Sequence, residues 1–334
     1  MFKNNAFNTF NKLNTLNTLI AIPALSALLA ATALWAQDYP AKAVRVVVPF
    51  APGGSNDIVG RILTAHLTDR LGRQFVIDNR SGAGGLIGTE LVAKSAADGY
   101  TLIVVSVAFP MNAAIYKLPY DPVKAFTPIV LLATGANGLA VHPALPVKTV
   151  KELIALAKAR PAQLQYSSAG IGTFQHLSSE MFKSLAGVNI LHVPYKGGGP
   201  ATIDLIAGQV QLSIGSLIVI LPHMRSNKIR IIATGGAQRA AALPDLPTIA
   251  ESGVTGYEAN NWWGVLAPAG VSDAIVRKLN TESNAVMALP ETRKRLAAEG
   301  AESMNLTPEQ FVKHIAAETA KWGKVTRDAN IRAE

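Results

Sequence analysis

Short apolar runs alternate with amphipathic stretches along the chain after its first 43 residues. The run VRVVVPF at residues 44–50 consists mainly of branched apolar residues, which is typical of a buried strand. The stretch that follows it, residues 57–72, carries apolar residues at helical spacing and ends at a glycine. Further strands are expected at 74–79 and 100–106, with a second helix at 84–96 between them. This β-α-β-α-β order predicts an α/β fold built on a parallel sheet with helices on both faces.

The same alternation returns in the second half of the chain. Strands are expected at 164–170, 190–195, 210–216 and 230–236, and helices at 173–187, 200–209 and 307–325. The last of these helices opens with Thr307, Pro308 and Gln310, which predicts a capping box with proline at the first helical position.

One segment of the first half is echoed in the second. The pattern Val-Pro-aromatic-x-x-Gly-Gly begins at Val48 and again at Val193, 145 positions later. Both copies describe a strand, a glycine loop and then a helix. Two such turns can resemble each other by chance; alternatively, each of two similar lobes presents one of these loops to a shared cleft.

The first 36 residues have the composition of a secretory signal peptide. Lys3 and Lys12 lie in a start without acidic residues, the run at 18–34 is almost wholly apolar, and small residues precede Ala36. The alternative is a retained membrane anchor, but a proline and many alanines make this run a weak membrane span. We therefore expect export to the periplasm, with cleavage near Ala36.

The charge balance favours an anionic ligand over a nucleic acid. The formal net charge of the whole chain is +9, and loss of Lys3 and Lys12 with the signal peptide lowers it to +7. The basic residues lie in short patches flanked by apolar residues at helical spacing, as on solvated helix faces, so no nucleic-acid partner is expected. The chain has no cysteine, which excludes disulfides and thiolate metal sites.

Three glycine loops each join the carboxyl end of an expected strand to the start of an expected helix. They are APGGSND at 51–57, SSAGIGT at 167–173 and KGGGPA at 196–201. Open α/β sheets bind ligands at such junctions, because free N–H groups and the positive end of the helix dipole attract an anion. Three loops of this kind indicate an anion site.

Nucleotides fit these loops poorly. None of the three loops ends in the Gly-Lys-Ser/Thr of a phosphate-binding P-loop. The segment GAGGLIG at 82–88 resembles a dinucleotide fingerprint, but its last glycine comes one position late and no acidic residue is well placed to bind a ribose. We expect no cofactor.

Catalytic and metal-binding patterns are also weak. The six histidines show no metal-ligand spacing, so no metal site is expected. An exported serine hydrolase that uses Ser55 or Ser168 with His176 stays an alternative. It requires a serine Oγ within hydrogen-bond reach of a histidine nitrogen, which we do not expect here. Ser55, Asn56 and Asp57 also suit the capping of a helix.

Several ordered segments resemble one family. They include YPAKAVRVVVPFAPGGSNDIVGRIL, DNRSGAGGLIGTELVAKSAADGYTL, LPYDPVKAFTPI, HVPYKGGGPA and ALPDLPTIAESGVTGYEANNWWGVLAPAG. From Tyr39 nearly to its end, the chain resembles the Bug-type solute receptors, which are the substrate-binding proteins of tripartite tricarboxylate transporters. The resemblance implies a two-lobed α/β periplasmic binding protein of type II topology, with a ligand cleft between the lobes and no catalytic residue.

The same resemblance implies the domain organisation and the partners. Lobe 1 is expected at 37–140 together with 262–334, and lobe 2 at 141–261. The ligand is expected to be a small carboxylate, such as a di- or tricarboxylate or an aromatic acid. The receptor is expected to act as a monomer with the membrane permease subunits of the transporter. A role as the sensor partner of a membrane kinase stays open.

The resemblance also implies the binding residues. From the first lobe it implicates Gly54, Ser55, Asn56, Asp57, Ser106 and Ala108; from the second lobe it implicates Ser168, Gly172, Thr173, Tyr195, Lys196 and Gly197. Asp57 is expected to orient amides rather than meet the anion, because two carboxylates repel each other. Relatives often carry an acidic residue and an asparagine where Gly215 and Ser216 stand here. The absence of the acidic side chain removes a partner for an ammonium group and leaves more room. It therefore favours a carboxylate without an amino group, or a bulkier one, over an amino acid.

Overall fold

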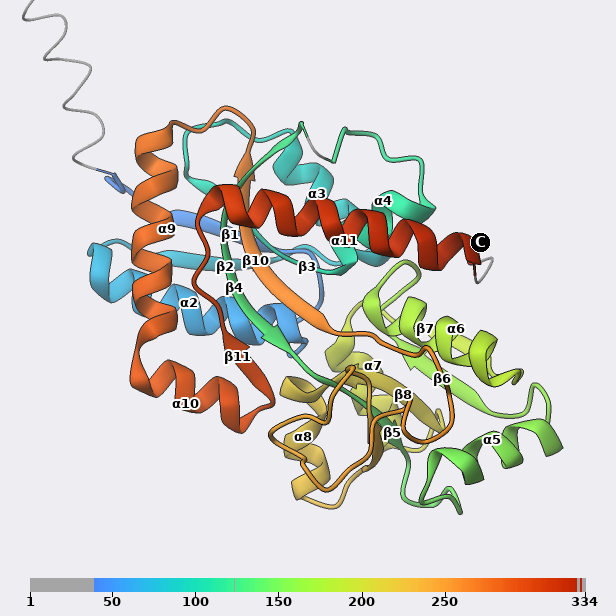
Figure 1. Cartoon of the computed structure of the whole chain (residues 1–334). Helices are drawn as coiled ribbons and strands as arrows, with labels where there is room; N and C mark the ends of the chain where they lie inside the picture. Colours follow the sequence, from blue (N-terminus) through green and yellow to red (C-terminus); the bar gives the residue numbers. More distant parts are fainter. Residues whose placement is uncertain (1–38, 123, 329–330, 332–334) are drawn as a thin grey trace, which may run out of the picture. The chain divides into compact units, whose positions relative to one another are not determined.

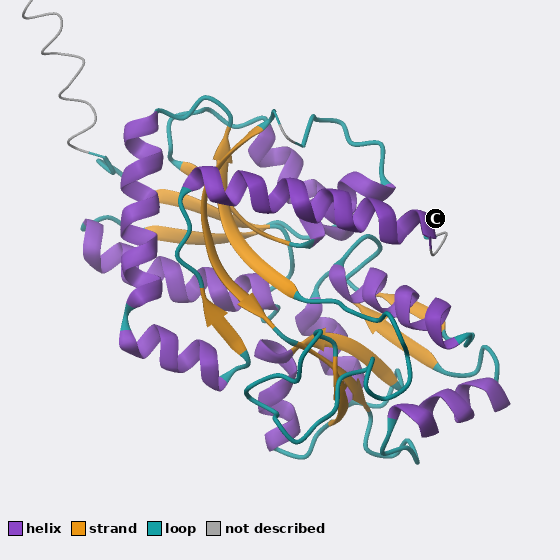
Figure 2. Ribbon diagram, viewed as in Figure 1, coloured by secondary structure: helices purple, strands orange, loops and turns teal. Residues whose placement is uncertain are grey.

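The computed structural model describes residues 39–122, 124–328 and 331, and residues 43–334 form the compact unit discussed below. The expected signal peptide therefore lies outside the described residues. Two sheets organise this unit, each with its own helices (Figures 1 and 2). None of the helices in the described part has both the length and the apolar character needed to cross a bilayer.

The first sheet has the strand order β11-β4-β10-β3-β1-β2. Its strands are β1 (Val44–Val48), β2 (Phe75–Asn79), β3 (Thr101–Ser106), β4 (Phe126–Gly135), β10 (Asn261–Pro268) and β11 (Ala301–Ser303). Its helices are α2 (Ser55–Leu71), the 3-10 turn η1 (Ala83–Gly85), α3 (Leu86–Ala93), α4 (Ala108–Ile115), α9 (Asp273–Ala288), α10 (Pro290–Ala298) and α11 (Pro308–Asp328). The expected β-α-β-α-β order is confirmed, and β1 pairs in parallel with both β2 and β3. The expected parallel pairing is thus present in these three strands, and β10, which returns from the second sheet, adds an antiparallel strand between β3 and β4.

The second sheet has the order β7-β6-β8-β5-β9. Its strands are β5 (Asn137–Val141), β6 (Gln165–Ser168), β7 (Leu191–Pro194), β8 (Leu212–Ser216) and β9 (Arg230–Thr234), and its helices are α5 (Val150–Ala159), α6 (Phe174–Ala186), α7 (Gly198–Ile206) and α8 (Leu217–Arg225). Strand β6 pairs in parallel with β7 and β8, whereas β5 pairs antiparallel with β8 and β9. The chain crosses between the sheets at Ala136 and again before Asn261.

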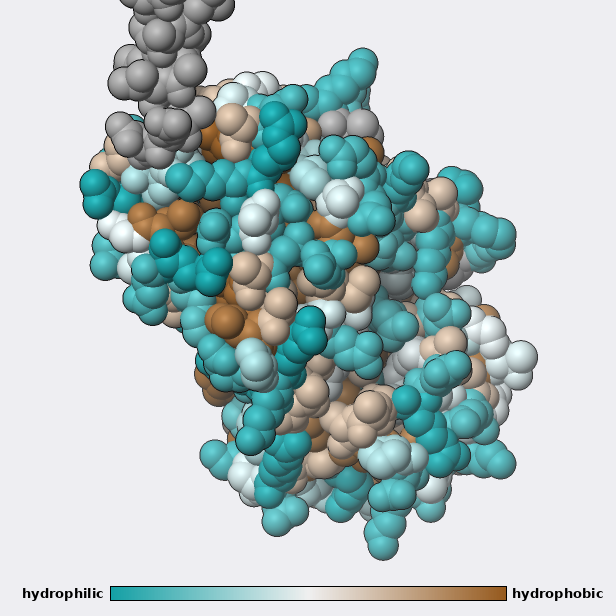
Figure 3. All heavy atoms as spheres, turned by 60° about the vertical axis from the view of Figure 1, so that its left-hand side comes forward, coloured by the Kyte–Doolittle hydropathy of each residue, from teal (hydrophilic) through white to brown (hydrophobic). Residues whose placement is uncertain are grey.

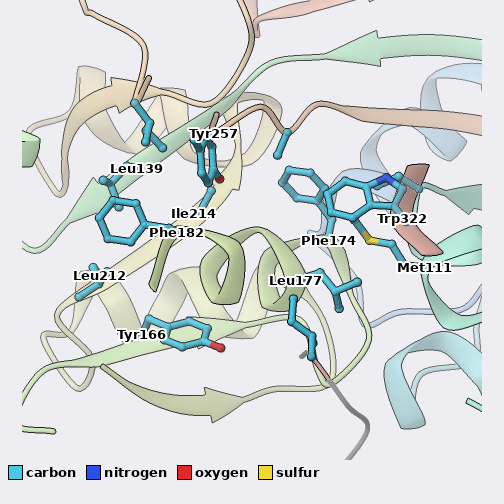
Figure 4. Close-up of a cluster of buried hydrophobic side chains, with 14 of the residues drawn as sticks. Met111, Leu139, Tyr166, Phe174, Leu177, Phe182, Leu212, Ile214, Tyr257 and Trp322 are labelled. Carbon is cyan, nitrogen blue, oxygen red and sulfur yellow. The ribbon is translucent and has the colours of Figure 1, made fainter. Parts of the chain in front are cut away.

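The core runs through both sheets. Phe174 of α6 and Trp322 of α11 pack edge to face, with 6.4 Å between the ring centroids. Met111 of α4 lies beside them (Figure 4). Farther along, Phe182 and Tyr257 pack near Ile214 (Figure 4). Helix α11 lies along α4 and is held at its start by the predicted capping box, because Thr307 and Gln310 exchange backbone-to-side-chain hydrogen bonds.

Hydrophobic side chains are scattered over the surface rather than gathered. The face in Figure 3 shows apolar positions interspersed among hydrophilic ones. The large hydrophobic side chains that are exposed come from different elements: Val76, Ile87, Leu185, Leu191, Ile203 and Val312.

Candidate ligand-binding site

A cavity of about 40 Å³ lies among loops that both sheets contribute. The first sheet supplies the loop after β1, the end of β3 and the start of β10. The second supplies the loop after β6, the start of α7 and the end of β8. Parallel strands bring their carboxyl ends to one edge, which is why loops so far apart in sequence meet here.

Five helices begin at this cavity. Its lining includes the N-cap residues of α2, α6 and α8 and the first residues of α4 and α7, which are Gly54, Thr173, Ser216, Ala108 and Gly198. None of these five helices has a side-chain hydrogen bond at its cap; α3 and α10 lack one as well, whereas α5 and α9 are capped by Thr149 and Ser272. The first amides of a helix lack partners within it and carry the positive end of its dipole. The cavity is therefore built to accept an anion.

Three lining side chains add polar groups. Trp263 Nε1 donates to Ser55 Oγ at 3.1 Å, so the hydroxyl accepts there and keeps its own proton for a ligand. The amide of Ala169 donates to Gln175 Oε1 at 2.9 Å, which fixes the orientation of the side chain and leaves its NH₂ group as a donor. Ser216 Oγ is buried and has no hydrogen-bond partner. A buried hydroxyl of this kind is expected to gain a partner when a ligand binds.

Among the residues that the structure describes, no charged side chain lines the cavity. Asp57 lies behind the loop, where its carboxylate accepts hydrogen bonds from the Gly53 amide, Arg61 Nε and Asn79 Nδ2 at 3.0–3.1 Å. Burial opposes ionisation of Asp57, but the hydrogen bonds from Arg61, Gly53 and Asn79 outweigh it and lower the pKa of the carboxyl. Asp57 thus holds the glycine loop in place from behind.

The capping interpretation of the residues after Gly54 was wrong for Ser55 and Asn56. Gly54 itself occupies the cap of α2, and Asn56 uses its Nδ2 to donate to the Val104 carbonyl at 3.1 Å. Both side chains therefore serve the packing and lining of the cavity instead of the helix end.

The structure brings half of the predicted binding residues together. Seven line the cavity: Gly54, Ser55, Asn56, Ser106, Ala108, Thr173 and Ser216. Tyr195 and Lys196 line a second, neighbouring cavity. Five line neither cavity: Asp57, Ser168, Gly172, Gly197 and Gly215. Of these, Gly197 is the N-cap residue of α7 and lies against Ala51, and a Cβ on Gly215 would meet Ile220 first, at 3.1 Å.

One expectation about histidine was wrong. Ser168 Oγ lies 2.6 Å from His192 Nε2, although we expected no serine Oγ within reach of a histidine nitrogen. Ser168 is fully buried, lines neither cavity and also accepts a hydrogen bond from the Gly170 amide. Burial, with His176 stacked on the ring, lowers the pKa of His192 to about 4. Ser168 lies at the start of the loop that precedes α6, and its oxygen is buried away from both cavities.

Seven lining residues were not predicted: Phe50, Ala169, Phe174, Gln175, Gly198, Val219 and Asn261. Phe50 belongs to the Pro-aromatic echo, and Gln175 lies in the first turn of a helix that follows a predicted loop, so both carried a signal. Asn261 arrives from the second crossing between the sheets. Its position depends on the return of β10, which the local sequence does not indicate.

Two α/β lobes that meet at an anion-accepting cavity define a periplasmic binding protein of type II topology. Residues 59–331 match the sequence model of one family of such proteins, described as the tripartite tricarboxylate transporter family receptor. The chain belongs to this family, whose members are substrate-binding receptors and not enzymes.

Relatives and solved structures agree with this assignment. The protein BugT of Bordetella pertussis is 36% identical over 305 residues, which cover 90% of this chain and 94% of BugT. The structure of R. palustris Rpa4515 with adipate is 40% identical, with a TM-score of 0.86, and covers 88% of this chain and 99% of its own. MatC from Rhodopseudomonas palustris with bound malate is 32% identical, with a TM-score of 0.83, over 86% and 99% of the two chains.

Proposed function

We propose that this protein captures a small carboxylate between its lobes and delivers it to the membrane permease of a tripartite tricarboxylate transporter. One observation carries the proposal: five uncapped helix N-termini surround a cavity that no charged side chain lines. Hydrogen bonds to an ionised group are stronger than those between neutral groups, so backbone amides and hydroxyls alone hold a carboxylate firmly there.

The polar groups of the cavity favour a plain carboxylate over an amino acid. Ser55 and Gln175 are oriented as donors by Trp263 and by the Ala169 amide. No acidic side chain lines the cavity to pair with an ammonium group. The adipate and malate of the two solved relatives make dicarboxylates the first class to test.

The proposed place of action is the periplasm, reached through the signal peptide expected at residues 1–36. We further propose that lobe 1 comprises 37–140 with 262–334 and that lobe 2 comprises 141–261. The two crossings between the sheets then form the hinge, and opening and closure about it admit and enclose the ligand.

Thermal unfolding of the purified, refolded protein tests this function. The panel contains dicarboxylates, tricarboxylates, aromatic acids and acidic amino acids, with nucleotides as controls. A ligand at about a hundred times its Kd stabilises the folded state by about 2.7 kcal/mol, which gives a readable rise in Tm. A rise with one carboxylate class supports the proposal. No rise with any carboxylate, or a rise with nucleotides alone, contradicts it.

A further inference from the structure

A carboxylate on α11 accepts hydrogen bonds from two tryptophans. Oε2 of Glu318 lies 3.2 Å from Trp262 Nε1 and 3.2 Å from Trp322 Nε1. Both indole rings are almost fully buried, and an indole nitrogen can only donate, so each needs an acceptor inside the protein. Glu318 is that acceptor for both. Hydrogen bonds to a carboxylate are stronger than those to a neutral oxygen, so this oxygen holds the two rings firmly.

The first of these tryptophans lies beside the ligand site. Trp262 is the second residue of β10, directly after Asn261, which lines the cavity. The Trp262 amide donates to Asn261 Oδ1 at 2.9 Å. The next residue, Trp263, donates from Nε1 to Ser55 Oγ, which also lines the cavity. The indole of Trp262 packs against His314 of α11, with 5.1 Å between the ring centroids. The position of Trp262 against α11 therefore governs where this end of β10 meets the cavity.

The second tryptophan reaches a residue of the other sheet. Trp322 packs edge to face with Phe174 of α6 (Figure 4). Phe174 lines the cavity from the second sheet. Glu318 and Trp322 are four residues apart on α11, so their side chains share one face of the helix. Glu318 thus connects two walls of the cavity, one through Trp262 and the other through Trp322.

We propose that Glu318 is a positioning residue for the ligand site. The residue itself lines neither cavity, so it acts through the two tryptophans. Because one oxygen holds both indoles, it fixes β10 against α11 and thereby sets Asn261 relative to Phe174. The carboxylate then determines the spacing of these walls, whichever anion lies between them. The inference rests on the proposed function for the identity of the cavity as the ligand site, but its first test needs no ligand.

The first test follows the indole signals of the ligand-free protein in nitrogen–proton correlation NMR spectra. The described residues contain three tryptophans, Trp262, Trp263 and Trp322, and each signal is assigned by its Trp→Phe variant. Trp263 is the reporter, because its Nε1 bonds to Ser55 at the cavity and not to Glu318. Glu318→Met keeps the length of the side chain without its acceptor oxygens and is expected to shift all three signals. Glu318→Gln keeps an acceptor oxygen and is expected to leave the Trp263 signal in place.

A second variant covers the case in which Glu318→Met does not fold. Glu318→Asp keeps the carboxylate but is one methylene shorter, too short to reach both indoles, and is also expected to shift the Trp263 signal. Glu282→Met is the matched control, because it removes a half-buried carboxylate that pairs with Arg70 at 2.7 Å and lines neither cavity. This control should leave all three signals in place.

Two spectral outcomes overturn the inference. The first is a Trp263 signal that stays in place in both the methionine and the aspartate variant of Glu318, because the carboxylate then serves only the packing of α11. The second is an equal shift of the Trp263 signal in Glu282→Met, because the shift then reflects a general loss of stability.

Ligand affinity gives the functional readout. Adipate is titrated first by calorimetry, followed by the other members of the carboxylate panel. For the member that binds, affinity is expected to fall about 3- to 10-fold in Glu318→Met and to be restored in Glu318→Gln. Unchanged affinity in Glu318→Met overturns the inference. If no carboxylate binds the unsubstituted protein, the proposed function fails, whereas the ligand-free spectra still decide the role of Glu318.

Discussion

The backbone amide of Ala51 donates to the carbonyl of Lys196 at 3.1 Å. These two residues occupy equivalent positions in the internal echo, 145 positions apart, and their loops come from the two sheets. The pattern noticed in the sequence therefore corresponds to a paired contact between the lobes. Both loops also reach the cavity, through Gly54 and Gly198.

Glycine at position 199 permits this contact. A Cβ on Gly199 would lie 2.5 Å from the Pro52 carbonyl oxygen, a backbone atom that cannot move aside without parting the loops. Gly199→Ala is therefore expected to weaken carboxylate binding about 10-fold or more. The loss of folding stability is expected to stay near about 1 kcal/mol, because the Ala51–Lys196 hydrogen bond is lost while alanine suits the first turn of α7. Calorimetric titration and chemical unfolding measure the two quantities. Gly323→Ala, in α11, has space for its methyl group and should leave binding intact.

A substitution of Ser55 distinguishes between two roles for this residue, ligand binding and capping of α2. Its hydroxyl accepts from Trp263 and lines the cavity, and the cap of α2 does not use it. Ser55→Ala is expected to lower carboxylate affinity about 10- to 100-fold, the worth of one hydrogen bond to a charged group, and also to lower the Tm, because the buried Nε1 of Trp263 loses its acceptor. Loss of a true cap costs about 1 kcal/mol of stability. A drop in Tm with unchanged affinity contradicts the binding role.

The stability of the folded protein at acid pH is expected to depend on Asp57, which holds the glycine loop after β1. Since the pKa of its carboxyl is lowered in the folded state, its contribution is present above the unfolded value near 3.8 and is lost as the pH falls through the folded value. Asp57→Asn is expected to cost about 1–3 kcal/mol of unfolding free energy at pH 7 and less at pH 3. Urea unfolding at the two pH values measures this. A cost that does not diminish at pH 3 argues against an ionised Asp57.

His192 gives a pH dependence of the same sign as Asp57, but at higher pH. Burial first, and then neighbouring His176, lower its pKa from 6.5 to about 4, so the unfolded chain binds its proton more readily between these values. Stability is therefore expected to rise with pH from about 4 to 6.5, with His192 supplying on the order of 1 kcal/mol after allowance for partial exposure. His192→Gln should flatten the slope without abolishing it, because burial also lowers the pKa of His223 and His314.

The sequence predicted where the helices and strands lie better than it predicted which loops of the two sheets meet. Apolar periodicity located the strands and helices around the first and second glycine loops, and half of the expected binding residues line one cavity. Periodicity reports which face of an element is buried, but not what crosses between sheets. Asn261 and Trp263 reach the site only because β10 returns antiparallel to β3, a long-range pairing without a local signal. The close contact of Ser168 with His192 was missed because it joins neighbouring strands side by side.

A crystal structure with the carboxylate that raises Tm most tests the central claim directly. The account predicts that one carboxylate lies in the cavity, with its oxygens about 2.7–3.1 Å from first-turn amides of α2 and α6 or from the hydroxyls of Ser55 and Ser216. No lysine or arginine side chain should contact that carboxylate. A ligand whose carboxylates are held only by cationic side chains, with these amides unoccupied, would contradict the account.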